Sequence, residues 1–372
     1  MNGFPGKLAV QQRVLPNYRA PFFDLLASAC DGGMSLFTGL PRSSEGITTT
    51  NQLQITNYHL GKNIHLFGGS LYLCYQRGLI DWLEEWNPDA LIVEANPRYL
   101  STPSAVNWMH KRDRPVIGWG LGAPPVSSIR ESGRAAFLRQ FDAMICYSNR
   151  GVEEYAKHGY PLDNLFVAHN AVSSSPTQDM PVRPDTFNPS TRLRQSGQAQ
   201  PVVLFVGRLQ FRKNIDLLLG ACAEIESQPR LLIVGDGPER EALEELAQEI
   251  YPSAEFVGSK HGDELKPYFA KADLFVLPGT GGLAVQEAMS YGLPVIVAQG
   301  DGTQDDLVRK ENGWQIPPDD FDVLLSTMKD ALSDAARLRR MGAESYRIVK
   351  EEINIEKMAD TFVRALNTLT AK

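Results

Sequence analysis

Short aliphatic segments alternate with longer amphipathic segments along nearly all of this 372-residue chain. The aliphatic segments fall at residues 8–14, 90–95, 115–120, 143–148 and 165–170 in the first half, and at 201–207, 230–235, 254–258, 273–279 and 294–299 in the second. Near-continuous apolar strands separated by helices of about ten to fifteen residues are typical of parallel sheets with helices on both faces. The alternation therefore predicts an α/β fold built from doubly wound sheets.

The two runs of strands are separated by residues 173–200, which are rich in Ser, Pro, Gln and Thr and show no sustained periodicity. Such a composition predicts a linker, and the chain length favours two domains. We expect a Rossmann-like N-terminal domain over residues 1–180, a linker over residues 181–200 and a Rossmann-like C-terminal domain over residues 201–353. A final amphipathic helix, over about residues 354–372, is expected to pack back on the first domain.

The predicted fold indicates where a ligand binds. In an open parallel sheet, ligands bind at the carboxyl ends of the strands, where the strand order reverses. Two doubly wound domains that face each other across a cleft would place the ligand between them. The segments that directly follow the strands are therefore the candidate binding segments.

Composition excludes several classes of protein. Hydrophobic residues make up 43% of the chain and charged residues 22%, an ordinary balance for a soluble globular protein. No apolar run is long enough to span a membrane, and the N-terminus does not read as a signal peptide. The four cysteines show no metal-ligand spacing and are interpreted as reduced thiols. We expect a cytoplasmic protein, with the inner face of the membrane as a second location.

The net charge of −7 is unevenly distributed. Residues 1–199 contain 18 Lys and Arg against 16 Asp and Glu, whereas the remainder contains 19 against 28. The acidic second half argues against a nucleic-acid partner. The weakly basic first half leaves open an anionic acceptor or a peripheral contact of the N-terminal domain with a membrane.

A basic turn follows the first strand of the second half, in the segment FVGRLQFRKNIDLL (205–218). Gly207 ends the strand, and Arg208 and Lys213 precede a helix that begins near Asn214. Two cations beside a helix N-terminus at the carboxyl edge of a sheet suit a diphosphate, because the backbone amides and the helix dipole add to the side chains. An ordinary solvated basic turn is the alternative interpretation.

A glycine-rich turn lies in a second strand-to-helix connection, LPGTGGLAVQEAMSYGLPVIV (277–297). The glycines at positions 279, 281 and 282 allow backbone amides to approach phosphate oxygens closely. Glu287 lies about one turn inside the following helix, where its carboxylate suits ribose hydroxyls, which donate hydrogen bonds. The alternative is a tight connection between a strand and a helix, with no ligand.

Together these segments resemble the glycosyltransferases of family 4 (group 1), which have the GT-B fold. The matching motifs are G-R-x(3-4)-K-G/N at Gly207–Asn214, V/I-G-D/E-G-P at Val234–Pro238, A-D-x(4)-P at Ala272–Pro278, the counterpart of E-G-F-G-L-x(3)-E-A-M at Gly279–Met289, and E-N-G-x(3)-P-P at Glu311–Pro318. They occur in the order and spacing of the family, over about residues 143 to 320.

The resemblance implies a role for each matching residue. Arg208 and Lys213 would be catalytic, because they would neutralise the donor diphosphate and help the nucleoside diphosphate to leave. Glu287 would hold the ribose hydroxyls and completes the catalytic set. Ser148 and Asn170 match positions near the cleft in the first domain, with capping or turn stabilisation as the alternative. The further donor-binding positions are Gly207, Asp236, Gly281, Gly282 and Leu283.

The chain departs from the family at three places. Gly279 occupies the position of the first of two family glutamates, which approaches the donor sugar in relatives, so the identity of the sugar is left open. No histidine follows the strand at residues 115–120, where many members have one in the cleft. A polar turn at residues 11–19 replaces the frequent Gly-Gly loop after the first strand.

Polar residues at strand ends of the first half are the acceptor-side candidates. The turn after the first strand carries cations and an aromatic ring, where an acceptor phosphate or sugar would bind. Glu94 follows another strand and is the best carboxylate for an acceptor contact, with helix capping or ion pairing as the alternative. The candidates are Arg13, Tyr18, Arg19, Glu94 and Asn170.

The resemblance implies a retaining glycosyltransferase that moves a hexose from a nucleoside-diphosphate sugar to a sugar or lipid-linked acceptor, in the synthesis of cell-surface polysaccharide or glycoconjugate. No Asp-x-Asp motif occurs in a suitable loop, so we expect neither a metal nor another cofactor. The alternatives are a nucleotide-sugar epimerase or phosphorylase on the same fold, and a non-catalytic protein that binds nucleotide sugars.

Overall fold

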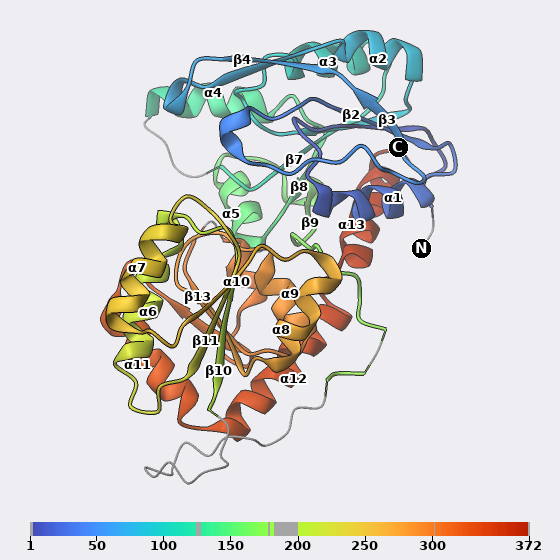
Figure 1. Ribbon diagram of the computed structural model, residues 1–372. Coiled ribbons are helices and arrows are strands. Elements are labelled where there is room, and N and C mark those ends of the chain that lie inside the picture. Colours follow the sequence, from blue (N-terminus) through green and yellow to red (C-terminus); the bar gives the residue numbers. More distant parts are fainter. Residues whose placement is uncertain (1–2, 124–127, 178, 182–199, 301, 371–372) are drawn as a thin grey trace. The chain divides into compact units, whose positions relative to one another are not determined.

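The computed structural model describes residues 3–123, 128–177, 179–181, 200–300 and 302–370, without the side chains of residues 128–132. Contacts divide the chain into two compact units, Met1–Val172 with Ile355–Lys372, and Ser173–Asn354 (Figure 1). Residues 173–177, which we expected in the first domain, therefore belong to the second unit. Most of the expected linker, residues 182–199, lies outside the described residues.

The first unit is built on a seven-stranded sheet in which all neighbouring strands are parallel. The strand order is β3-β2-β1-β6-β7-β8-β9, so the order reverses between β1 and β6. This reversal is the point at which doubly wound sheets bind ligands. The strands are β1 (Leu8–Gln11), β2 (Met34–Thr38), β3 (Asn57–Leu60), β6 (Ala90–Glu94), β7 (Val116–Gly120), β8 (Ala143–Cys146) and β9 (Leu165–Val167).

Helices cover both faces of this sheet (Figure 1). On one face, α2 (Leu79–Trp86) and α3 (Thr102–His110) contribute apolar side chains to a buried core with the central strands. On the other, α1 (Ala20–Ser28) and α13 (Ile355–Thr370) pack against each other, and α13 also contacts β8 and β9. Two further helices, α4 (Ser128–Leu138) and α5 (Asn149–Lys157), follow β7 and β8.

Aromatic contacts hold α13 against the first sheet. The ring of Phe362, which is fully buried, lies 5.1 Å from the ring of Phe22 on α1 and 4.9 Å from the ring of Trp119 in β7, measured between centroids. Both pairs have the edge-to-face geometry that aromatic quadrupoles favour. The last described helix of the chain therefore completes the core of the first unit.

Truncating this ring tests the contribution of α13. Phe362→Ala removes the edge-to-face pairs and leaves a cavity, so we expect the free energy of unfolding to fall by about 3–5 kcal/mol. Thr368→Ala, on the exposed side of the same helix, should stay within about 0.5 kcal/mol of the parent. Urea unfolding followed by tryptophan fluorescence measures both, and equal midpoints for the two variants would contradict the role of α13 in the core.

A two-stranded antiparallel hairpin, β4 (Lys62–Leu66) and β5 (Leu73–Arg77), lies outside the main sheet. It is joined to the segment after β6, because Cys74 N–H donates to Arg98 O (3.0 Å) and Leu100 N–H donates to Cys74 O (2.9 Å). Strands β2 and β3 and this hairpin were not predicted. Their segments are short or mix polar with apolar residues, so they lack the continuous apolar pattern of the central strands.

The second unit contains a six-stranded parallel sheet of order β12-β11-β10-β13-β14-β15, which reverses between β10 and β13. All five strands predicted for the second half are present, and β15 is an addition. The strands are β10 (Val202–Val206), β11 (Arg230–Val234), β12 (Glu255–Gly258), β13 (Leu274–Leu277), β14 (Val295–Ala298) and β15 (Gly313–Ile316).

Helices flank the second sheet on both sides, with α6, α7 and α11 on one face and α8, α9 and α12 on the other (Figure 1). The predicted α/β class with two doubly wound parallel sheets is therefore confirmed. No helix in the described part of the chain is long and apolar enough to cross a bilayer. The helices are α6 (Ile215–Ala223), α7 (Arg240–Ile250), α8 (Lys266–Lys271), α9 (Ala284–Ser290), α10 (Thr303–Leu307), α11 (Phe321–Leu332) and α12 (Ala335–Glu351).

Candidate functional site

The loops that follow β10 and β11 pack backbone against backbone. Leu209 N–H donates to Asp236 O at 2.9 Å. A Cβ on Gly235 would lie 1.8 Å from Gly207 O, and a Cβ on Gly237 would lie 2.1 Å from Leu209 O. No side chain fits at these distances, so the glycines of this turn are required by the close approach of the two loops.

Lys213 lies buried beside the loop that follows β13. Its Nζ donates to Thr280 O at 2.7 Å and to Gly281 O at 3.2 Å. Burial, together with the charge of Arg212, lowers the pKa of this ammonium to about 8. Among the described residues no carboxylate pairs with it. A buried cation with carbonyl partners alone favours the arrival of an anion, which would restore the charge balance.

Gly281 and Gly282 shape the surface beside this ammonium. Gly281 has φ +76°, and a Cβ there would lie 3.6 Å from Lys213 Nζ and 3.4 Å from Arg212 Nη1. Gly282 has φ +154°, and a Cβ there would lie 2.3 Å from Leu277 Cδ2. The turn therefore leaves room next to two cations at the point where the order of the second sheet reverses.

The packing around Gly279 accounts for the absence of the first family glutamate at this position. A Cβ at this position would lie 2.2 Å from Arg212 O and 2.4 Å from Lys213 Cα. Thr280 N–H donates to the same Arg212 O at 3.0 Å, which fixes the two segments together. The backbone that carries Lys213 thus occupies the space that the first glutamate of the family would need.

This packing predicts the effect of a side chain at the position. Gly279→Ala forces Arg212 and Lys213 to shift, so we expect the free energy of unfolding to fall by about 1–3 kcal/mol. Gly133→Ala is the matched control, because a Cβ on this residue of α4 would meet no neighbour and alanine favours a helix. Chemical unfolding of both variants measures the difference; an unchanged midpoint for Gly279→Ala would contradict the close packing.

Glu287 lies in the first turn of α9, after the cap residue Leu283. Burial raises the pKa of its carboxyl group to about 7. No hydrogen bond or ion pair to this carboxylate is found among the described residues. A partly buried carboxylate without a donor suits a ligand that brings hydroxyl groups.

Two residues to which the sequence analysis gave no role hold the segments around this site together. Asn214 has φ +53°, a conformation that favours Asn or Gly, and its Nδ2 donates to Asp319 Oδ1 at 2.7 Å. Gln286 is fully buried; its Oε1 accepts from Ser173 N–H (2.9 Å) and its Nε2 donates to Ile353 O (2.9 Å). The K-G/N motif signals the first residue, whereas nothing in the sequence distinguishes Gln286 from a solvated helical residue.

Of two further predicted residues, Ser148 is a helix cap and Asp236 makes contacts within its own turn. Ser148 Oγ accepts from Gly151 N–H at 3.2 Å at the start of α5, which is the capping alternative. Asp236 Oδ1 accepts from Gly237 N–H at 2.7 Å, and Oδ2 pairs with Arg240 at 3.2 Å beside the start of α7. Donor binding by Asp236 stays a prediction.

The structure brings Arg13 and Glu94 together at the order reversal of the first sheet. The Glu94 carboxylate accepts from Arg13 N–H at 2.7 Å, and the Arg13 guanidinium pairs with Glu45 at 2.9 Å. Burial raises the pKa of Glu94 to about 7, although the N–H and charge of Arg13 lower it. Glu45 was missed because it lies in a polar loop without a motif.

Arg19 and Asn170 also meet. The buried guanidinium of Arg19 donates to Asn170 Oδ1 and to Ala171 O (3.1 Å), and it lies 5.8 Å from the ring centroid of Tyr147. Tyr18 is exposed beside it. These contacts account for Arg19 as a packing residue, and its role toward an acceptor stays a prediction.

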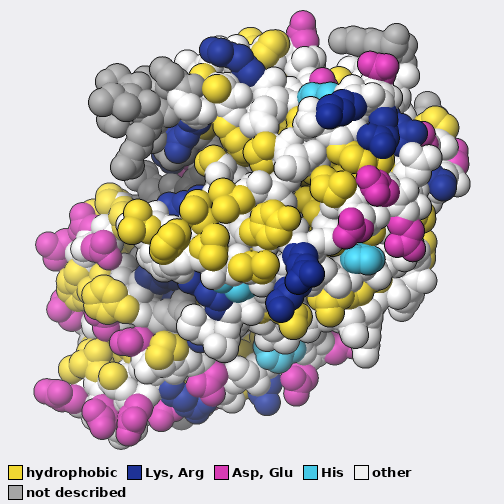
Figure 2. Space-filling view, turned by 90° about the horizontal axis from the view of Figure 1, so that it is seen from above, with side chains coloured by type: hydrophobic (Ala, Val, Ile, Leu, Met, Phe, Trp, Pro, Cys, Tyr) yellow, Lys and Arg dark blue, Asp and Glu magenta, His cyan; other side chains and the backbone are white. Residues whose placement is uncertain are grey.

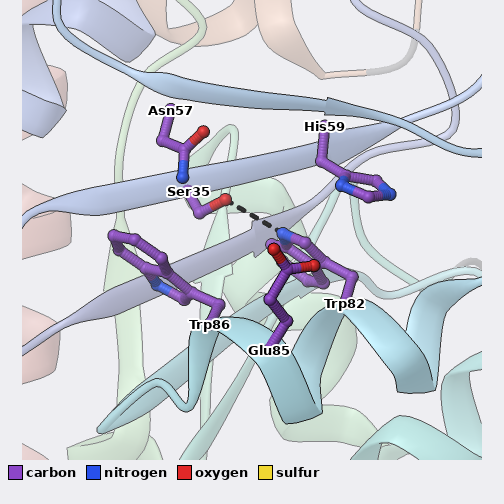
Figure 3. Close-up of a pocket in the computed structure, with 6 residues that line it drawn as sticks. All are labelled: Ser35, Asn57, His59, Trp82, Glu85 and Trp86. Atoms are coloured by element: carbon purple, nitrogen blue, oxygen red, sulfur yellow. Dashed lines mark hydrogen bonds between the residues drawn. The ribbon is translucent and has the colours of Figure 1, made fainter.

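A small pocket lies elsewhere, between α2 and the amino ends of β2 and β3 (Figure 3). Trp82 Nε1 donates to Ser35 Oγ at 2.9 Å, and Glu85 and Trp86 line the pocket from the same helix. Its volume of about 80 Å³ is smaller than the cavity of about 150 Å³ that holds benzene in other proteins, so it does not enclose a hexose. It contains none of the predicted site residues.

The described residues contain no cluster of metal ligands. No group of three His, Cys, Asp or Glu there lies close enough to hold a metal ion. The four cysteines are all buried and unpaired.

Comparison with known proteins connects these features to a family. Residues 191–348 match the model of the family described as "Glycosyl transferases group 1". A GDP-mannose-dependent alpha-mannosyltransferase of Corynebacterium glutamicum is 33% identical over 214 residues, which are 55% of this chain and 48% of that protein. The lipopolysaccharide core biosynthesis glycosyltransferase LpsE of Rhizobium meliloti is 21% identical over 84% of this chain and 99% of its own length. For the first three curated relatives, the match covers half of their length or less: 48%, 36% and 31%.

Solved structures share the whole fold. HepE of Anabaena in complex with UDP is similar with a TM-score of 0.70 and 16% identity, over 97% of this chain and 99% of that one. Sucrose-phosphate synthase from Thermosynechococcus elongatus gives a TM-score of 0.66 and 21% identity, over 98% and 99%. The fold is therefore that of the GT-B glycosyltransferases. Residues 191–348 match the group 1 glycosyltransferase model, as the sequence motifs indicated.

Proposed function

We propose that the protein is a retaining glycosyltransferase that moves a hexose from a nucleoside-diphosphate sugar to a sugar or lipid-linked acceptor. The observation that carries this proposal is the buried ammonium of Lys213, which has carbonyl partners and no carboxylate among the described residues, beside the open face of Gly281. UDP in the solved HepE complex and GDP-mannose in the name of the mannosyltransferase support the donor class.

The chemistry follows from where charge develops. When the bond between the sugar and the phosphate breaks, negative charge accumulates on the leaving diphosphate. The ammonium of Lys213 and the guanidinium of Arg208, exposed on the turn after β10, stabilise this charge without a metal ion. The Glu287 carboxylate accepts hydrogen bonds from the ribose hydroxyls. In a retaining transfer, the acceptor attacks from the face that the diphosphate leaves, and the diphosphate takes the acceptor proton.

The acceptor side is proposed to lie at the first sheet, at Arg13 and Glu94. With a pKa near 7, Glu94 accepts a hydrogen bond from an acceptor hydroxyl when it is ionised. LpsE acts in lipopolysaccharide core biosynthesis, which supports a place for this protein in the synthesis of cell-surface polysaccharide or glycoconjugate. A cytoplasmic location, with the membrane face as an alternative, is part of the same proposal.

Removing the ammonium group of Lys213 tests the proposal. Lys213→Ala should lower kcat/KM about 10²–10³-fold, because one pre-organised charge at the leaving group is lost. Lys271→Ala, an exposed cation on α8 of the same unit, should leave turnover unchanged. The assay measures sugar transfer from a labelled nucleoside-diphosphate sugar, chosen as the one that raises the melting temperature most.

The outcomes separate the alternatives. Near-parental turnover of Lys213→Ala, with an unchanged melting temperature, would refute the assigned role. Donor binding by the parent protein without transfer or hydrolysis would favour a nucleotide-sugar-binding protein. A labelled isomer of the donor would identify an epimerase, and a sugar phosphate formed from inorganic phosphate would identify a phosphorylase.

The pH dependence of donor affinity tests two residues together. In the ligand-free protein the pKa of Glu287 is about 7 and that of Lys213 about 8. Below pH about 7 the carboxylate protonates and loses acceptor capacity, and above pH about 8 the ammonium loses its charge, so affinity should be highest between these values. Affinity should fall by up to about tenfold per pH unit on either side.

Calorimetric titration with an intact nucleoside-diphosphate sugar measures this profile, because its phosphates do not titrate in the range. Glu287→Gln should flatten the acidic limb and Lys213→Arg the alkaline limb, each without changing the other. A profile of Glu287→Gln that still falls below pH 7 would assign the acidic limb to another group.

A further inference from the structure

The hairpin of β4 and β5 has its polar and apolar faces reversed. Side chains alternate between the two faces of a strand, and an exposed hairpin on a water-soluble protein ordinarily turns its apolar residues inward. Here the inward residues are polar with the exception of Cys74: Asn63 Nδ2 donates to Arg13 O (2.7 Å), and Gln76 Nε2 donates to Gln12 O (3.1 Å). The outward residues include Ile64 and Leu66.

The apolar surface continues over the tip of the hairpin. We define the hairpin surface as the exposed side chains Ile64, Leu66, Phe67, Leu71 and Tyr75; Phe67 and Leu71 are each 72% exposed. Phe67 has φ +59°, an unfavourable conformation for a bulky residue, and no packing against the described residues accounts for a phenyl ring that is 72% exposed. Large exposed apolar patches commonly mark interaction sites.

Figure 2 looks down on the side where β4 lies in Figure 1. It shows hydrophobic side chains gathered in a band, with charged side chains of both signs at its border. The residues of the hairpin surface are also close in the strand register, because Ile64 stands opposite Tyr75 and Leu66 stands next to the tip. The apolar side chains of the hairpin surface are therefore grouped rather than scattered singly.

Charge at the base of the hairpin has one sign. Lys62 and Arg77 are both exposed and stand directly opposite each other in the strand register, where like charges repel. The segment Gly46–Gly78 contains no Asp or Glu, although the chain has 44 of them. No ion pair to either cation is found among the described residues. An anion supplied from outside would relieve this repulsion.

The pattern favours one occupant. An apolar tip with cations at its base matches the cross-section of a bilayer surface, where apolar side chains enter the acyl boundary by about 5–10 Å and basic groups meet anionic headgroups. Four residue steps separate Lys62 from Leu66, which corresponds to about 13 Å along a strand. A second copy of the chain would instead bring the same cations together.

We propose that the hairpin surface binds a bilayer that contains anionic lipids. The inward face of the hairpin holds the backbone of Arg13 and Gln12, directly after β1, so the bound bilayer lies beside Arg13 and Glu94. Resting on the proposed function, this placement makes the acceptor lipid-linked, with its polar end at these two residues.

Vesicle co-sedimentation of the full chain tests the proposal. The probes are vesicles of phosphatidylcholine alone and of phosphatidylcholine mixed with an equal part of phosphatidylglycerol. The parent protein should bind the mixed vesicles and lose affinity as salt rises. Phe67→Ser/Leu71→Ser should bind at least tenfold more weakly, whereas Leu162→Ser, at an exposed leucine elsewhere in the first unit, should bind like the parent.

A charge variant separates the two components of binding. Lys62→Gln/Arg77→Gln should lose about 30-fold in affinity for the mixed vesicles, at about 1 kcal/mol for each cation, and should no longer distinguish them from phosphatidylcholine. Circular dichroism checks that every variant is folded; these side chains are exposed, so their replacement leaves the core unchanged.

Several results would overturn the proposal. They are a parent protein that binds neither kind of vesicle, tip variants that bind like Leu162→Ser, and a dimer in light scattering that Phe67→Ser/Leu71→Ser dissociates without any vesicle binding. The thermal shift with nucleoside-diphosphate sugars is measured on the same samples. A retained shift without vesicle binding refutes the membrane surface alone, whereas vesicle binding without a shift refutes the proposed function alone.

Discussion

Close approach of backbone to backbone is the constraint on which the site in the second unit depends. The loops after β10, β11 and β13 lie against one another with no room for a Cβ at Gly235, Gly237 or Gly279. This contact buries Lys213 and sets its ammonium on the carbonyl oxygens of the next loop. The packing therefore positions the cation before any ligand arrives, which suits the electrostatic role that we propose for it.

The same contact explains why the family motif changes at one position and stays intact at others. A glutamate and a backbone segment cannot occupy the same space, and this chain places the backbone of Arg212 and Lys213 where the first family glutamate would stand. Glu287 is unaffected, because it lies in α9, after the turn that contains Gly279. The proposed diphosphate and ribose contacts are therefore separable from the sugar contact that the first family glutamate would make.

The sequence predicted those parts of the structure that a continuous apolar segment or a family motif marks. Continuous apolar segments predicted the central strands and all five predicted strands of the second sheet, and the motifs predicted that Lys213 and Gly281 share one site. Edge strand β3 was missed because it mixes polar with apolar residues. The hairpin was missed because its apolar side chains face solvent and its polar ones face the protein. The close packing around Gly279 and the hydrogen bonds of Gln286 to Ser173 and Ile353 join segments that are far apart in the chain. No local sequence pattern reveals such contacts.

The position of α13 has a consequence for biosynthesis. Phe22 and Trp119 are synthesised early, but the ring that packs against both of them belongs to residue 362. The ribosome must therefore complete the whole of the second unit before the first can close its core. Domains generally fold as units during synthesis. We therefore expect the second unit to fold while one apolar face of the first sheet is still uncovered, because α13 has not yet been synthesised. That interval exposes the nascent chain to chaperones and to aggregation.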